Sequence, residues 1–241
     1  MVADTANLKD AAANHNASEA KLKQNLVPLE NGDQLSRLEF EQRYLAMPPN
    51  VRAELIEGVV YVASPVRLAH HGKPHAALMA WLTDYWLATP GVELADNTTV
   101  RLDWDNEPQP DVLLRIERGG QSSISQDDYV EGAPELMVEV AASSAAYDLH
   151  SKKTVYRRNG VQEYIVWQIA ERHLIWFQLC KGAYVAFVPD ESGVIRSQVF
   201  PGLWLNVPAL LTGQLRQVVA TLQQGLKTPE HASFVKQLAA K

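Results

Sequence analysis

The sequence predicts a mixed α/β fold in which a β-sheet is flanked by helices. Along the 241 residues we expect a helix, a hairpin, a second helix, three strands, a third helix, another strand and a closing strand meander. A helix between two apolar strands, near residues 140 and 163, predicts a right-handed parallel crossover. The short apolar runs that follow are separated by turn residues and indicate an added antiparallel meander.

The N-terminal part of the chain predicts an extension followed by one helix. Residues 1–34 are polar and rich in Ala, Asn and Lys, which indicates a flexible or weakly helical extension. Residues 35–46 predict a helix, because Ser36 can cap it and Glu39 follows three positions later. The Met-Pro-Pro-Asn segment that comes next ends this helix, since proline cannot continue it.

A hairpin and a long helix are expected next. Residues 53–63 predict a β-hairpin, because Glu57 and Gly58 separate two short apolar runs. Residues 69–89 predict an amphipathic helix with an apolar side that faces the core. The side chains assigned to that side are Leu78, Trp81, Leu82, Tyr85 and Trp86.

The middle of the chain predicts three strands and the crossover helix. The strands are expected over residues 92–102, 110–116 and 135–140. Residues 117–131 are polar and rich in turn formers, so we expect a loop there. The helix is expected over residues 145–159, with Gly160 as its C-cap.

The C-terminal part predicts the remaining strands and a helical end. Strands are expected over residues 163–169, 174–180, 183–188 and 194–199. Residues 215–241 predict one or two surface helices. We therefore divide the chain into an N-terminal extension (1–34), a main domain (35–213) and a C-terminal helical extension (214–241).

Composition narrows the class of protein. The single cysteine, Cys180, excludes a disulfide within the chain and is expected to be a buried structural thiol, which fits a reducing compartment. No apolar run reaches transmembrane length and no signal-peptide pattern opens the chain, so we expect a cytoplasmic protein without a membrane partner. The net charge of -6 argues against broad, non-specific nucleic-acid binding.

Three acidic residues lie in or beside predicted strands. Glu139 is central in the apolar run ELMVEV, where a carboxylate is costly to bury unless it meets a cation, a proton or a metal. Asp111 begins the run PDVLLRI, and Glu54 begins AELIEG. Two carboxylates on adjacent strands make a hard oxygen site that suits Mg²⁺ or Mn²⁺.

A lysine can join these carboxylates. Lys152 lies four residues after Asp148 and four before Tyr156, so the three side chains share one helix face. A lysine beside two carboxylates can orient or deprotonate a water and stabilise a phosphate, as in metal-assisted phosphodiester hydrolysis. Taken singly, each residue has an ordinary interpretation: a turn aspartate, an acid on an exposed strand edge, or a solvated helix ion pair. Their joint occurrence favours a site.

Several short sequence motifs resemble those of a known protein family. In order they are AELIEGVV followed by SP and a His, QPDVLL, PELMVEV, DLHSKKTVY, RRNGVQEYIVW and FPGLWLNVPALL. Over residues 35–211 the chain thereby resembles the Uma2 family of putative restriction endonucleases, which belongs to the PD-(D/E)XK nuclease superfamily. The resemblance implies a restriction-endonuclease-like fold and a Mg²⁺- or Mn²⁺-dependent endonuclease that acts on nucleic acid, in the first place DNA.

The resemblance also implies roles for individual residues. Asp111 and Glu139 fall on the metal-binding acids, and Glu54 falls on an early acid that assists them. Ala141 stands where the standard motif has lysine, so the catalytic lysine falls on Lys152 of the next helix, with Lys153 as the fallback.

The chain departs from the family pattern at two places. It has Ala142-Ser143-Ser144 in place of Ser-Pro-Ser, and Gln168 in place of a further acid.

Other readings of the sequence stay open. His70, Lys153 and Arg157 are candidates for nucleic-acid contact. His71 and His75 have the spacing of a zinc pair, although no third ligand is evident. The chain could also be a catalytically inactive nuclease-fold module for nucleic-acid binding or assembly, or a scaffold whose terminal extensions drive oligomerisation. A homodimer is expected, because an enzyme that cuts two strands benefits from two-fold symmetry.

Overall fold

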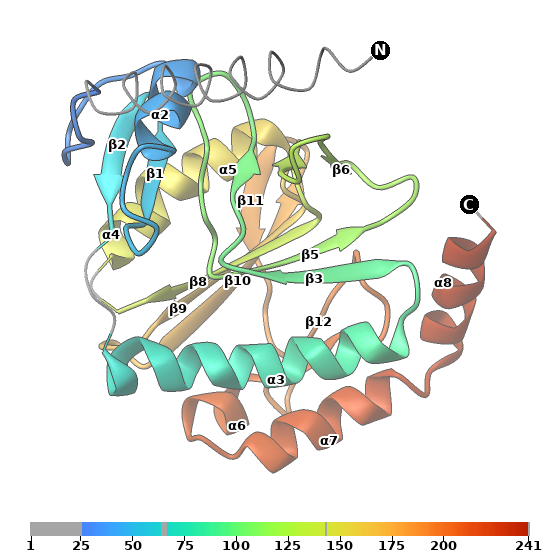
Figure 1. Ribbon diagram of the computed structural model, residues 1–241. Helices are drawn as coiled ribbons and strands as arrows, with labels where there is room; N and C mark the ends of the chain where they lie inside the picture. Colours follow the sequence, from blue (N-terminus) through green and yellow to red (C-terminus); the bar gives the residue numbers. More distant parts are fainter. Residues whose placement is uncertain (1–25, 64–66, 143, 241) are drawn as a thin grey trace, which may run out of the picture.

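The computed structural model describes residues 26–63, 67–142 and 144–240 (Figure 1). Most of the expected N-terminal extension, including most of its possible helix near residues 17–26, lies outside the described residues. Residues 26–34 run along the hairpin, where the Gly32 amide donates to the Val60 carbonyl at 2.9 Å. In the parts of the chain that are described, no helix is long and apolar enough to span a membrane.

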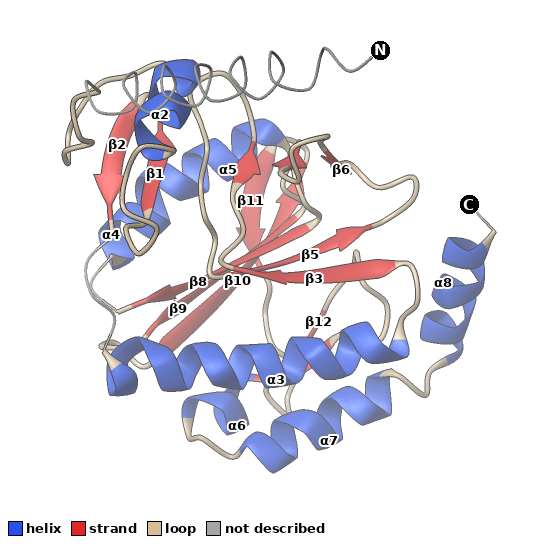
Figure 2. Cartoon of the chain, in the orientation of Figure 1, coloured by secondary structure: helices blue, strands red, loops and turns tan. Residues whose placement is uncertain are grey.

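The centre of the molecule is a six-stranded mixed sheet in the order β11-β10-β9-β8-β5-β3 (Figure 2). Its strands are β3 (Val92–Asp96), β5 (Val112–Ile116), β8 (Leu136–Ala141), β9 (Glu163–Gln168), β10 (His173–Cys180) and β11 (Ala183–Ala186). Strands β8 and β9 pair in parallel, and all other neighbours in this sheet are antiparallel. The predicted mixed sheet with one parallel crossover is confirmed.

Helices cover both faces of this sheet (Figure 1). One face carries α3 (Lys73–Ala88), α6 (Val207–Leu211) and α7 (Leu215–Gly225). The other carries the crossover helix, which consists of α4 (Ala145–Tyr147), the π-helical turn η2 (Asp148–Lys152) and α5 (Lys153–Asn159). The hairpin of β1 (Ala53–Ile56) and β2 (Val59–Val62) lies on this second side with α2 (Arg37–Tyr44).

Strand β8 divides its side chains between the two cores. Leu136, Val138 and Val140 pack in the larger apolar cluster under α3, whereas Met137 and Ala141 pack in the cluster under α5. Successive residues of a strand point to opposite faces. The side chain of Glu139 therefore belongs to the α5 face, where it is 4% exposed.

Local capping residues determine several helix boundaries. Ser36 caps α2, as predicted, because its hydroxyl accepts from the Glu39 amide. Gly160 caps α5 at φ 85°, a left-handed conformation that favours glycine. The predicted helix over residues 69–89 forms as a π-helical turn, η1 (Leu68–Gly72), followed by α3.

The region between β3 and β8 differs from the expectation. The predicted strand 92–102 is divided, because β4 (Val100–Arg101) leaves the main sheet and pairs with β7 (Val130–Glu131). The predicted loop 117–131 supplies β7 and its partner β6 (Ser123–Ile124). The β4–β7 pairing joins Val100 to Val130, which are far apart in the sequence, so no local pattern reports it, whereas β6 and β7 pair locally.

Trp86 also differs from the expectation, since its side chain is 40% exposed rather than buried. It follows the fully buried Tyr85, and adjacent helical residues point about 100° apart. That rotation carries Trp86 past the edge of the apolar side.

The C-terminal part completes the larger core. A two-stranded sheet of β12 (Val194–Arg196) and β13 (Trp204–Asn206) precedes α6, α7 and α8 (Pro229–Ala239). The expected helices over residues 215–241 are more than a surface layer, because Val218, Leu222 and Leu238 are buried in the cluster under α3. Cys180, expected to be buried, is half-buried in β10.

Candidate functional site

Strand register brings Asp111 opposite Glu139. Val112 of β5 pairs with Val138 of β8 in an antiparallel ladder, so the next position outward aligns Asp111 with Glu139. Residues opposite each other in such a ladder point to the same face of the sheet. The Asp111 carboxylate is fixed there, since its Oδ2 accepts from the Val140 amide at 2.6 Å.

The crossover helix places Lys152 over Glu139. The Lys152 ammonium donates to Glu139 Oε1 at 3.0 Å and to Glu54 Oε1 at 2.9 Å. Glu54 comes from β1, and the Gln109 amide, two residues before Asp111, also donates to its Oε1 at 2.8 Å. The four predicted catalytic residues, Glu54, Asp111, Glu139 and Lys152, thus gather at one place between the sheet, the hairpin and the helix.

Two tyrosines and one further acid complete this group. The Tyr156 hydroxyl donates to Glu139 Oε1 at 2.8 Å, and the Tyr147 ring lies 5.4 Å from the Lys152 ammonium. Asp148 is buried with one carboxylate oxygen 3.9 Å from that ammonium, and the Ser144 hydroxyl donates to the other oxygen at 2.5 Å. Lys152 therefore faces several acids with one positive charge.

The excess of carboxylates shifts the pKa values at this place. Burial, together with the nearby charges of Asp148, Asp111 and Glu54, raises the pKa of Glu139 well above its ordinary value despite the opposing effect of Lys152. Burial likewise raises the pKa of Asp148 to about 6. Burial acts to lower the pKa of Lys152, but the carboxylates of Glu139, Glu54 and Asp148 outweigh it and raise that pKa. Lys152 is accordingly a fixed cation, and the carboxylates around it repel one another.

A histidine approaches Asp111 from the other side of the sheet. His71, in the π-helical turn η1, has its Nε2 at 2.9 Å from Asp111 Oδ1. The hydrogen bond to Asp111 raises the pKa of His71. Burial acts to raise the pKa of Asp111, but the contacts with His71 and the Val140 amide outweigh it and lower that pKa. Asp111 thus stays ionised more readily than Glu139 and Asp148, whose pKa values are raised.

The sequence predicted some of these contacts and not others. Asp148, Lys152 and Tyr156 were predicted to share one helix face, and Asp148 Oδ1 does lie 3.9 Å from the Lys152 ammonium. His71 was considered only as half of a zinc pair, and its contact with Asp111 joins residues 40 positions apart. Local spacing does not report such a contact, so only the tertiary structure reveals it.

The donor set can be tested against a divalent metal ion. Among the described residues, no three His, Cys, Asp or Glu side chains converge as a ready-made metal site, which also counts against the zinc pair. Mg²⁺, however, is commonly held by one or two carboxylates, with water and substrate phosphate as its other ligands. Both hydrogen bonds to Glu139 within the described chain reach Oε1, so its Oε2 is left for another ligand. The hard oxygens of Asp111 and Glu139 therefore fit such an ion.

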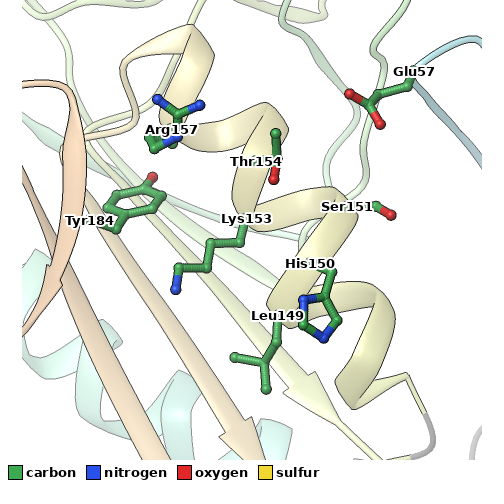
Figure 3. A pocket seen from close by; sticks show the side chains of 8 residues that line it. All are labelled: Glu57, Leu149, His150, Ser151, Lys153, Thr154, Arg157 and Tyr184. Carbon is green, nitrogen blue, oxygen red and sulfur yellow. The ribbon is translucent and has the colours of Figure 1, made fainter.

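The predicted nucleic-acid contacts lie elsewhere on the surface. His70 is exposed on η1, next to His71. Lys153 and Arg157 line a pocket beside the crossover helix, which Glu139 does not line (Figure 3). Their contact with nucleic acid stays a prediction.

Comparisons with known proteins give one matching family model and a similar solved structure. The family model described as "Uma2: Putative restriction endonuclease" matches residues 38–208. A solved structure, described as a putative nuclease belonging to DUF820 from Anabaena variabilis ATCC 29413, superposes with a TM-score of 0.51. It is 12% identical, and the match covers 75% of this chain and 97% of that one, so the likeness concerns the fold. No curated protein matches the chain.

Proposed function

The chain belongs to the Uma2 family of putative restriction endonucleases, and we propose that it is a Mg²⁺- or Mn²⁺-dependent phosphodiester hydrolase that cuts DNA as an endonuclease. One observation supports this most directly. Asp111 and Glu139 are aligned across two adjacent strands, beside a Lys152 ammonium held between Glu139 and Glu54. Such an arrangement combines oxygen ligands with a fixed cation, which is what phosphodiester hydrolysis requires.

Each residue has a distinct role in this proposal. Asp111 and Glu139 would hold the metal ion, which when bound would polarise the phosphate and activate the attacking water. The Lys152 ammonium orients a water or a phosphate oxygen by hydrogen bonding, and its raised pKa makes it a poor base. Glu54 fixes Lys152 through the contact at 2.9 Å.

The alternative function, an inactive nuclease-fold module for nucleic-acid binding or assembly, has its own supporting observation. Asp111 Oδ1 is engaged by His71, and Glu139 is bonded to both Lys152 and Tyr156. Both carboxylate oxygens of Asp111 are therefore engaged by protein groups, and a metal ion would have to displace His71 or bind beside it.

Plasmid cleavage tests the two functions. We expect purified protein with Mg²⁺ or Mn²⁺ to cut plasmid DNA, and Asp111→Asn or Glu139→Gln to reduce the rate by at least about 100-fold, because each removes a charged metal ligand. Asp128→Asn is the matched control. Asp128 is exposed with φ 68°, which asparagine adopts readily, so cleavage should not change.

The same experiment also distinguishes the hydrolase from the inactive module. Circular dichroism must show that both variants keep the wild-type fold. If the wild-type protein cuts neither duplex nor single-stranded nucleic acid with either metal, the hydrolase is excluded. Calorimetric titration that finds no Mg²⁺ or Mn²⁺ binding at millimolar concentration would then favour the inactive module.

A further inference from the structure

A pocket of about 500 Å³ lies on the outer side of the crossover helix (Figure 3). The helix contributes Lys153 and Arg157 on the side that faces Tyr184 of β11, and Ser151 and Thr154 on the side of Glu57. Lys152, one residue before Lys153, points instead to the sheet and is buried. The helix thus presents one lysine to the acids of the candidate site and the next lysine to this pocket.

Lys153 and Arg157, the Lys and Arg side chains of the pocket, have no acidic partner among the residues that the structure describes. Within the described residues, neither Lys153 nor Arg157 forms an ion pair, although the protein as a whole is acidic. The Lys153 ammonium lies 3.8 Å from the centre of the Phe177 ring, and partial burial lowers its pKa. A cation–π contact compensates only part of the lost hydration of an ammonium. An anion in the pocket would compensate for the remaining loss of hydration of the Lys153 ammonium.

The remaining polar groups of the pocket are also compatible with a bound anion. Arg157 is held in place, because its Nη1 donates to the Gly182 carbonyl at 2.9 Å and leaves its other N–H groups available. Glu57, the acid on the pocket wall, lies 3.5 Å from Arg158, which offsets its charge. The charge in the pocket is therefore positive overall.

We propose that this pocket binds a phosphate group, with Lys153 and Arg157, four residues apart on one side of the helix, supplying the positive charge. Arginine and lysine bind phosphate through charge-assisted hydrogen bonds. The phosphate has two sources, the backbone of a nucleic-acid strand or a free phosphorylated small molecule. The strand source rests on the proposed function, whereas the small-molecule source does not.

Binding of two probes by the full chain tests the proposal. We would titrate inorganic phosphate and a short DNA oligonucleotide at constant ionic strength, with EDTA to prevent cleavage, and measure affinity by NMR or calorimetry. Lys153→Gln and Arg157→Gln should each weaken binding about ten-fold or more, the effect of losing one charge-assisted hydrogen bond. Lys153→Arg, which keeps the charge, should retain most of the affinity.

Arg216→Gln is the matched control, because it makes the same charge change on α7, across the sheet from the pocket. It should bind both probes as wild type does. Loss of inorganic phosphate binding in the two pocket variants indicates a small phosphorylated ligand, and loss of oligonucleotide binding alone indicates a strand. If neither probe binds, or if Lys153→Gln and Arg157→Gln bind like Arg216→Gln, the proposal is overturned.

The nuclease proposal fails separately from this one. Phosphate binding that depends on Lys153, in a protein that cuts no plasmid, would support the pocket and exclude the hydrolase. Cleavage by wild-type protein, with both pocket variants binding the probes normally, would support the hydrolase and exclude phosphate binding in the pocket.

Discussion

At the scale of single residues, the protein has a second group of interacting charged side chains besides the candidate site. This group consists of Glu107, Glu41 and Arg101. Glu107 is 1% exposed and is held to the hairpin by backbone hydrogen bonds with Leu55. Burial, and then the nearby carboxylate of Glu41, raises the pKa of Glu107 to about 8. Arg101 Nε lies 2.8 Å from Glu41 Oε1 and offsets only part of this repulsion. Glu107 is therefore protonated in the folded protein at neutral pH.

Substituting Glu107 tests this directly. The pKa of Glu107 is about 8 in the folded protein and near its ordinary 4.5 when unfolded, so between these values only the folded protein keeps the proton. The stabilisation is complete below the unfolded pKa and is lost as pH rises through about 8. Glu107→Gln mimics the protonated form, so its stability should fall less than that of wild type between about pH 5 and 8. Urea denaturation across that range measures the difference.

Glu117→Gln is the control for this measurement. Glu117 is exposed, so its substitution should leave the pH dependence of the wild type unchanged. A Glu107→Gln variant that loses stability with pH as steeply as wild type would contradict the burial of a protonated carboxyl.

The sequence predicted some residues of the candidate site and missed others for a physical reason. An acid such as Glu139 inside an apolar run conflicts with its neighbours, and that conflict is visible without a structure. Glu54 and Lys152 also stood out beside predicted strands, although their roles came from the family resemblance, and the structure places the Lys152 ammonium 2.9 Å from Glu54 and 3.0 Å from Glu139. The contact of His71 with Asp111 crosses the sheet edge and leaves no trace in the local pattern.

At the scale of elements, local chemistry determined where helices begin and end. The caps at Ser36 and Gly160 were predictable, because each satisfies backbone groups within a few residues. The small sheet of β4, β6 and β7 was not, since each of its strands is only 2 residues long and β4 joins it by a pairing that is distant in the sequence. Elements whose stability is encoded locally were thus predicted, and those that depend on distant partners were not.

The C-cap of the crossover helix gives a prediction at this scale. Gly160→Ala should destabilise the protein by roughly 1 kcal/mol, because alanine is strained in the left-handed region. The added methyl group meets nothing closer than 3.8 Å, so the cost comes from the backbone alone. Gly72→Ala is the comparison, since Gly72 has φ -58° and its added Cβ makes an ordinary contact at 3.7 Å. Thermal denaturation that ranks Gly160→Ala as stable as Gly72→Ala would argue against this conformation.

At the scale of the whole molecule, the two cores share the central sheet and serve different ends. The cluster under α3 is mainly apolar, with Trp81, Tyr85 and Trp176 fully buried, and its buried acid Glu163 accepts from the Trp176 indole and the Ser197 hydroxyl. The cluster under α5 ends at the buried acids and Lys152. Apolar burial in the larger core therefore stabilises the fold and can offset the free-energy cost of burying like charges on the other face of the sheet. Its integrity depends on the C-terminal helices, which close it.

Removal of residues 214–241 tests whether these helices are an appendage or part of the domain. Leu222 is fully buried and Leu238 is 6% exposed, both in the core under α3, so we expect the shortened chain to lose cooperative thermal unfolding. Two point variants on α7 separate packing from chain length. Leu222→Ala should cost about 2–5 kcal/mol, whereas Leu215→Ala, at a side chain that is 39% exposed, should cost less than about 1 kcal/mol. A shortened chain that unfolds at the wild-type temperature would instead make residues 214–241 a separate extension, and light scattering would then show whether they drive oligomerisation.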